Sequence, residues 1–416
     1  MPTPPDAPIL VDHLFRHEAG RLVAVLTRLF GFDRLEVAED LVQDTFVQAY
    51  ETWRLRGLPD NPTAWLYKVA KNKAYTYVQR QRTAEKATAD LRLGLPAGYT
   101  IQAHIEAAFQ ALSDSQLQML FAVCHPRLPA DAQVALALKT LCGFSIAEVS
   151  HAFLTTPDTI TKRLYRAKEK IRQEQLSMDF PPAEALPGRL DGVLRCIYLL
   201  FNEGYYSASP DAVVRQDLCR EALRLGLLLL EAPATRQPAV YALVALMCFH
   251  ASRLASRTAA DGDLLPWHAQ DRARWHPGLQ AQGVAHLNAA ATGLEVTSYH
   301  VEAMIAYHHT QPDTPAKWQE LLQLFNQLLR LQASPIVALS RAYVLSKSNS
   351  PAAAIAAAEQ IEGMGSSGLY HALLGELYEG LNQQRAAAHW QQALALTTEV
   401  RKQDMLRERL QRCLAG

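Results

Sequence analysis

The sequence has almost no residue pattern typical of β-strands. Alternation of apolar and polar residues with a period of two is rare, whereas Ala, Leu, Gln, Glu and Arg recur at helical spacing along most of the 416 residues. Metal and redox motifs are also missing, because the six cysteines form no CxxC pair and no HExxH stretch occurs. These features predict an all-α protein without a metal site, whose cysteines are reduced thiols in helical cores.

Long hydrophobic runs are absent as well. The longest apolar run, 239–249, is too short to span a bilayer, and the proline-rich, acidic start of the chain is not typical of a signal peptide. The formal net charge is zero, which argues against a protein that coats nucleic acid with uniformly basic charge. We therefore expect a cytoplasmic protein with no membrane partner, and any nucleic-acid contact must come from local basic stretches.

Two polar, proline- and glycine-bearing breaks divide the helical pattern. The predicted divisions are a first domain 1–86, a linker 87–101, a second domain 102–176, a linker 177–188 and a C-terminal helical domain 189–416. Within the last domain, an offset of 35 residues aligns Tyr343 with Tyr378 and brings small residues into register. This spacing predicts tetratricopeptide-like repeats near 335–396, and a generic alanine-rich helical bundle is the alternative.

Charge reverses sign between two consecutive helical patterns near the start of the chain. Residues 33–51 hold six acids and one base, whereas residues 52–86 hold eight bases, two acids and several aromatic residues. An acidic face beside a basic, aromatic face indicates a protein that joins a protein machine to nucleic acid.

The acidic pattern, from about Val37 to Trp53, predicts an amphipathic helix. Its inner stripe should be Leu41, Val42, Thr45, Phe46, Ala49 and Trp53. Its outer face should carry Glu39, Asp40, Gln43, Asp44, Val47 and Glu51. A charged face can be merely solvated, but an apolar Val47 within the acidic row suggests a protein interface.

The basic pattern begins near Ala64, after a loop that spans Leu55–Thr63. Its outer face should carry Lys68, Lys71, Asn72, Tyr75, Gln79 and Arg82. Such bases can neutralise phosphates, and aromatic residues at Trp65, Tyr67 and Tyr75 can stack on unpaired bases. The alternative is that these aromatic residues belong to the core or its rim.

A helix-turn-helix pattern follows in the second domain. Ser145 and Glu148 form a capping box, and Thr156 with Pro157 predicts the start of a second helix. Ile160, Leu164, Ala167 and Ile171 should be buried, while Thr159, Lys162, Arg163, Arg166 and Lys170 should face outward. A basic second helix is typical of major-groove binding, although helical hairpins are common and Leu154 stands where many such turns have glycine.

These stretches carry a resemblance to a known family. AEDLVQDTFVQAYETW (38–53) and PDNPTAWLYKVAKNKAY (59–75) resemble region two of extracytoplasmic-function sigma factors, which belong to the sigma-70 family. FSIAEVSHAFLTTPDTITKRLYRAKEKIR (144–172) resembles sigma region four. DSQLQMLFAVCHPRL (114–128) and LDGVLRCIYLLFNEGYYSAS (190–209) are similar to sigma factors that carry a long C-terminal extension.

The resemblance implies partners for each surface. The acidic helix would dock on the clamp helices of the polymerase beta-prime subunit through Glu39, Asp40, Gln43, Asp44 and Val47. The loop with Asp60 and Asn61 would capture a flipped base of the minus-ten element, beside Trp65, Lys68, Lys71, Asn72, Tyr75 and Arg82. Thr159, Lys162, Arg163 and Arg166 would contact the minus-thirty-five element, and region four would also contact the polymerase beta flap.

The sequence therefore predicts an alternative sigma factor that binds core RNA polymerase and promoter DNA, with a fused C-terminal domain that modulates activity and can bind a protein partner. No cofactor is expected. The alternative is a helix-turn-helix regulator with a ligand- or protein-sensing helical domain, which would bind duplex DNA without polymerase. An enzyme in the C-terminal domain is the third class, but the sequence holds no catalytic constellation there, so none is predicted.

Overall fold

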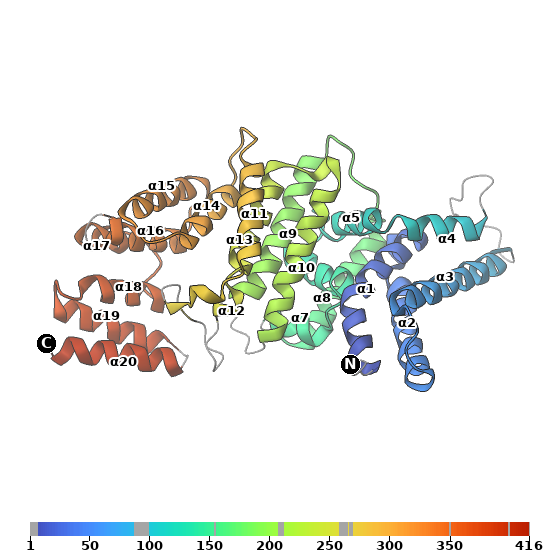
Figure 1. The fold of residues 1–416 in the computed structure, drawn as a ribbon, viewed down its shortest axis with the longest axis horizontal. Helices are drawn as coiled ribbons and strands as arrows, with labels where there is room; N and C mark the ends of the chain where they lie inside the picture. Colours follow the sequence, from blue (N-terminus) through green and yellow to red (C-terminus); the bar gives the residue numbers. More distant parts are fainter. Residues whose placement is uncertain are drawn as a thin grey trace. The chain divides into compact units, whose positions relative to one another are not determined.

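The computed structural model describes residues 7–86, 100–153, 155–206, 212–257, 265, 269–348, 351–397 and 400–415. These residues form helices joined by turns and contain no strand, which confirms the all-α prediction (Figure 1). They belong to two compact units, one of Met1–Arg236 with Arg257–Gln270 and one of Gln237–Ser256 with Asp271–Gly416. Within the described ranges, no helix is both long and apolar enough to cross a membrane.

The first unit contains every predicted contact residue, on its helices or, for Asp60 and Asn61, in the loop before α3. Its helices are α1 (Ala7–Phe30), α2 (Leu35–Arg56), α3 (Pro62–Lys86), α4 (Ile101–Gln110), α5 (Leu112–Val123), α6 (Ala130–Leu136), α7 (Ile146–Ala152), α8 (Pro157–Gln173), α9 (Leu186–Tyr206) and α10 (Ala212–Glu231). A π-helical segment, η2 (Ala137–Leu141), follows α6 directly. Helix α1 packs against α2 on one side and against α5 and η2 on the other, so its residues Leu22, Val25 and Leu26 are fully buried.

The predicted linker 177–188 packs on the first unit. Met178 is buried, and the Phe180 ring lies 5.1 Å from the Phe121 ring in an edge-to-face contact. Helices α9 and α10 then lie against α5, α6 and α7, so the division of the chain by contacts comes near residue 236. The predicted domain boundaries stay predictions, and residues 87–99 of the other linker lie outside the described residues.

The second unit is built from helical hairpins. Its helices are α11 (Pro238–Ala251), α12 (Leu254–Arg257, whose last residue belongs to the first unit), α13 (Pro277–Ala290), α14 (Ser298–Thr310), α15 (Pro315–Leu331), α16 (Pro335–Ser348), α17 (Pro351–Glu359), α18 (Gly368–Tyr378), α19 (Gln383–Leu396) and α20 (Val400–Ala415). Tyr343 and Tyr378, which the 35-residue offset aligns, lie on the first helices of two successive hairpins, α16–α17 and α18–α19. A shared core with Ala358, Trp390 and Ala393 joins these hairpins.

All six cysteines are free and buried, which confirms that they are core thiols. Burial raises the pKa of the Cys142 and Cys248 thiols, and a hydrogen bond with Cys196 together with burial raises that of Cys124. Cys124, Cys142 and Cys248 are therefore protonated packing residues rather than nucleophiles.

Candidate functional site

Helix α2 is amphipathic, as the sequence predicts. Five of the six residues expected on its inner stripe are buried, and Leu41 is partly exposed. On the opposite face Asp40, Gln43 and Asp44 are exposed, and Val47 exposes 50% of its surface. Glu51, also expected on this face, is exposed too. The helix therefore presents three carboxylates and an apolar side chain to solvent, an arrangement that suits a protein partner better than simple solvation does.

Glu39 is the exception on this face. Its side chain is only 18% exposed, and one of its carboxylate oxygens lies 2.6 Å from the ammonium of Lys168 on α8. The same ammonium lies 4.0 Å from Glu36, and Arg172 lies 3.7 Å from Glu36. Helices α2 and α8 are thus joined by ion pairs between residues more than a hundred positions apart in the sequence.

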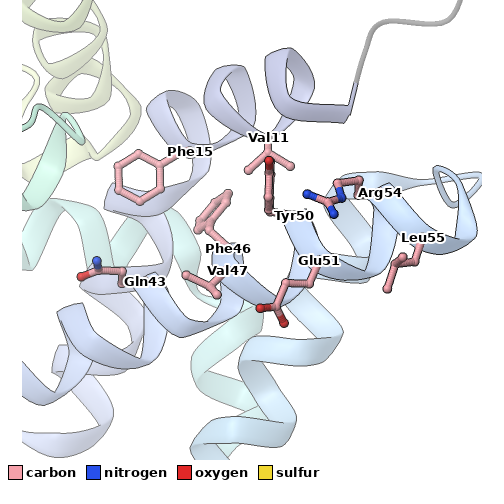
Figure 2. Close-up of a pocket in the computed structure, with 9 residues that line it drawn as sticks. All are labelled: Val11, Phe15, Gln43, Phe46, Val47, Tyr50, Glu51, Arg54 and Leu55. Carbon is pink, nitrogen blue, oxygen red and sulfur yellow. The ribbon is translucent and has the colours of Figure 1, made fainter.

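An apolar groove lies beside Val47 (Figure 2). It has a volume of about 640 Å³. Figure 2 shows Val11 and Phe15 reaching from α1 toward Phe46 and Tyr50 of α2, and the Phe15 and Phe46 rings meet edge to face at 5.0 Å. The remaining lining residues are Gln43, Val47, Glu51, Arg54 and Leu55.

Sequence reasoning missed most of this groove. Tyr50 is 39% exposed and Leu55 is 79% exposed, although both are large hydrophobic residues on α2. The available signal was spacing, because Val47, Tyr50 and Arg54 follow one another at three and four residues and so share one face of α2.

The loop before α3 is fixed by a helix cap. The side-chain oxygen of Asn61 accepts a hydrogen bond from the backbone N–H of Ala64 at 2.9 Å, while Asp60 is exposed. The Trp65 ring packs edge to face on buried Trp53 at 5.4 Å and remains partly exposed. The loop is therefore anchored at the joint between α2 and α3, with polar groups of Asp60 and Asn61 at its surface.

Some residues on the outer face of α3 are exposed to solvent, and others pair with residues of the same chain. Lys68 and Asn72 are exposed, and Tyr75 is 37% exposed with its hydroxyl 2.7 Å from the Gln79 amide. Lys71 is instead paired with Glu106 of α4 at 2.7 Å, above the ring of Phe109. The side chain of Arg82 lies outside the described residues.

Tyr67 takes part in packing rather than in the exposed face. Its hydroxyl donates a hydrogen bond to Glu18 of α1 at 2.8 Å, and its ring meets Phe109 edge to face. Burial, followed by the charge of Glu18, raises the pKa of this hydroxyl, so Tyr67 stays neutral. The core alternative is therefore favoured for this aromatic residue.

The two helices of the helix-turn-helix are capped as the sequence predicts. Ser145 and Glu148 form the reciprocal capping box of α7, and the Thr156 hydroxyl accepts from the N–H of Thr159 at the start of α8. The predicted inner stripe of α8, from Ile160 to Ile171, is buried at all four positions. Leu154, in the turn between the helices, lies outside the described residues.

The outward residues of α8 differ in how exposed they are and in whether they form ion pairs with other helices. Thr159, Lys162 and Arg166 are exposed, and Lys162 pairs with Asp158 one turn before it on the same helix, at 2.8 Å. Arg163 is 22% exposed, 3.0 Å from Asp131 of α6, and its guanidinium lies above the Phe153 ring. Tyr165, which sequence reasoning did not single out, exposes 60% of its surface between these bases.

Other chemistry is sparse among the described residues. They contain no group of three or more His, Cys, Asp or Glu residues arranged to hold a metal ion. His125, beside Cys124, bonds the backbone N–H of Arg127 through its ring, and burial together with nearby arginines lowers its pKa. This Cys-His pair therefore serves local structure.

Comparison with known families assigns three parts of the chain. Sigma-70 region 2 matches residues 14–84, sigma-70 region 4 matches residues 118–171, and a family of unknown function (DUF6596) matches residues 189–291. The matched residues include α2, α7 and all but the last two residues of α3 and of α8, whereas Val11 of the groove lies before residue 14.

Similar proteins fall into two kinds. An uncharacterized protein of Rhizobium meliloti, R00370, is 33% identical over 391 residues, which are 91% of this chain and 90% of that protein. The ECF RNA polymerase sigma-E factor of Haemophilus influenzae is 27% identical over 37% of this chain and 82% of its own length. The ECF RNA polymerase sigma-E factor of Escherichia coli K12 is 29% identical over 32% of this chain and 70% of its own length. No solved structure matches the chain at a significant level.

Proposed function

This chain belongs to the sigma-70 family of RNA polymerase sigma factors, in the extracytoplasmic-function group and with a long helical C-terminal extension, and we propose that it directs polymerase to two-element promoters. One observation carries the proposal: regions 2 and 4 occur in order, the first with an exposed acidic face on α2 and the second with a capped, basic α8. Core RNA polymerase and promoter DNA are the partners of a sigma factor, which acts by binding rather than by catalysis.

We assign polymerase docking to the α2 face and the groove beside it. Asp40 and Asp44 would steer the encounter with basic polymerase helices of the beta-prime clamp, because exposed charges act mainly on association and orientation. Val47 and the groove would take up an apolar side chain at the centre of the contact. Gln43 lines both surfaces, and Glu39 would join the contact only after it leaves Lys168.

We assign promoter contact to α3 with its preceding loop and to α8. Asp60, Asn61 and Trp65 would hold the extruded base of the minus-ten element, next to Lys68, Asn72 and Tyr75. Thr159, Lys162 and Arg166 would face the minus-thirty-five element in the major groove. Lys71 forms an ion pair with Glu106, and Arg163 forms one with Asp131, so we expect them to bind DNA only after those pairs open.

Reconstituted transcription tests this function. Purified full-length protein, added to core polymerase and a library of promoter fragments, should yield sequence-dependent transcripts that core polymerase alone does not make. If the protein neither associates with core polymerase nor supports initiation, the sigma assignment fails. Tight binding of the isolated chain to duplex DNA, with no effect of polymerase, would instead favour the helix-turn-helix regulator.

The double variant Lys162→Ala with Arg166→Ala tests the assignment of α8. A well-placed base contact contributes roughly 1 to 3 kcal/mol, so we expect about 30-fold weaker promoter-dependent transcription, measured at fixed salt on a minus-thirty-five-dependent template. The double variant Arg330→Ala with Arg274→Ala removes the same charge from exposed positions outside regions 2 and 4 and should transcribe normally. Equal activity of both double variants would remove α8 from the DNA interface.

The two promoter contacts require the first unit to open. Elements centred about 25 base pairs apart lie roughly 85 Å apart along the DNA, at 3.4 Å per base pair. A compact unit of this length has a radius of gyration of about 18 Å, and therefore a diameter of roughly 45 Å. The ion pairs that join α2 to α8 thus belong to a closed state, and we propose that polymerase binding separates regions 2 and 4.

We propose that the extension modulates this activity. Successive helical hairpins, such as those of the second unit, are typical of proteins that bind peptides or other proteins. Helices α9 and α10 lie within the first unit, so the extension begins in direct contact with the sigma regions. The proposal also implies that the protein acts in the cytoplasm, where the polymerase is.

A further inference from the structure

Helix α10 of the extension lies where region 2 and region 4 meet. Helices α9 and α10 pack on each other and lie against α5 and α7 (Figure 1). Helix α9 also contacts α6. Arg189, near the start of α9, helps to hold these helices in position, because it donates a hydrogen bond to the Phe121 carbonyl at 2.6 Å. Charged residues of α10 then reach α1 of region 2, so the extension touches both promoter-binding parts.

The first three-way contact is centred on Arg16 of α1. Its guanidinium lies 2.5 Å from Glu148 of α7 and 3.6 Å from Asp217 of α10. The three side chains are only 22%, 21% and 16% exposed, so solvent screens these charges weakly. One side chain therefore links region 2, region 4 and the extension.

The partners of Arg16 hold it in place and charged. Glu148 is fixed by the capping box of α7, and the Phe144 ring lies 5.0 Å below the guanidinium. Burial alone would raise the pKa of Glu148, but hydrogen bonds from Ser145 and Arg16 lower it. Burial likewise opposes the charge of Arg16, yet Glu148 and Asp217 raise its pKa. Arg16 and Glu148 are thus both charged, and their ion pair is a pair of full charges.

The second three-way contact is at the carbonyl of Leu141, at the end of η2. Helix α1 approaches this carbonyl so closely that a Cβ atom on Gly20 would lie 2.0 Å from its oxygen. Arg224 of α10 donates to the same oxygen at 3.3 Å, and it is held by Glu221, whose side chain is 7% exposed, at 2.7 Å. Region 2, region 4 and the extension meet here again.

From these two contacts we infer that α10 staples regions 2 and 4 together in the closed state, so that movement of the extension controls how readily the sigma factor opens. This inference rests on the proposed function, because it concerns the opening that promoter binding requires. If α10 moved away, Arg16 would lose its ion pair with Asp217. A ligand or protein that displaces α10 would therefore favour the open, polymerase-binding state.

The test uses the full chain with a fluorescent donor and acceptor on exposed positions of α2 and α8, through Gln48→Cys and Thr161→Cys. The six native cysteines are buried, so labelling is directed to the new ones. Asp217→Arg places a cation beside Arg16, and we expect the low-transfer, open population to rise about five-fold without polymerase. The isosteric Asp217→Asn should shift it in the same direction by about two-fold.

Glu231→Arg is the matched control, since Glu231 is exposed on the same helix, and it should leave energy transfer unchanged. Apparent affinity for core polymerase should rise about as much as the open population does, because a closed fraction weakens binding in proportion. If Asp217→Asn folds normally and neither transfer nor affinity changes, α10 is not a staple. If core polymerase fails to lower transfer in the parent protein, the proposed opening fails separately.

Discussion

Reversing both charges at Asp40 and Asp44 to Arg should weaken binding of core polymerase by about 100-fold. Both carboxylates are exposed on α2, and among the described residues no ion pair involves either one. Four units of charge change on the proposed docking face would replace attraction by repulsion, and like-charge contacts at an interface cost several kcal/mol. Equilibrium binding of labelled protein to core polymerase, measured at two salt concentrations, checks the effect, which should diminish at high salt.

The fold should survive this change, since neither residue contributes to the buried stripe of α2. Glu231→Arg with Glu295→Arg is the control, because it alters net charge equally at exposed positions outside regions 2 and 4. Equal polymerase affinity for the two double variants would remove Asp40 and Asp44 from the docking face.

Glu39 is a poor choice for the same experiment. Its carboxylate is paired with Lys168, so reversing its charge would break the closed state and alter the docking face at once. Opening would strengthen polymerase binding while the lost charge would weaken it, and the two effects would partly cancel. Reversing the charges of Asp40 and Asp44 instead changes the proposed docking face without breaking the ion pairs between α2 and α8.

Local sequence patterns predicted the helices and their faces because the determinants are a few residues apart. The capping box at Ser145, the Pro157 start of α8 and the buried stripe that begins at Ile160 all depend on spacings of three or four residues. The same reasoning placed Asp40, Asp44 and Lys162 on exposed surfaces. Such features follow from helical geometry, whatever the tertiary fold.

Long-range pairing was beyond that reasoning. The partners of Lys71, Arg163 and Glu39 come from other helices, at separations that periodicity does not encode. Proline content at 181–187 indicated a linker, but it reports on backbone conformation, and the segment packs through Phe180 on Phe121 instead. Sequence could therefore predict which faces of these helices point outward, but not which of their residues pair within the chain.

Replacing Gly20 by Ala should destabilise the first unit by about 3 kcal/mol. Helix propensity alone predicts the opposite sign, since Ala favours a helix interior over Gly by about 1 kcal/mol. Sterics should prevail here, because the new Cβ would lie 2.0 Å from the Leu141 oxygen, and backbone on both sides must shift to relieve the overlap. Hydrogen exchange of peptides from α1 and η2 measures the loss of stability at the site of the substitution.

Gly192→Ala is the control, and we expect its effect on stability to have the opposite sign. Gly192 also lies in a helix, α9, but an added Cβ would be 3.6 Å from the Cys124 oxygen, an ordinary contact, so propensity should prevail and stability should rise slightly. Because the Leu141 carbonyl also accepts from Arg224, a forced shift at Gly20 should loosen α10 as well. Faster exchange in α1, η2 and α10 together, with α9 unaffected in the control, is the expected result. Exchange unchanged in α1 would mean that the helices do not approach at Gly20, and would remove one of the two contacts on which the staple depends.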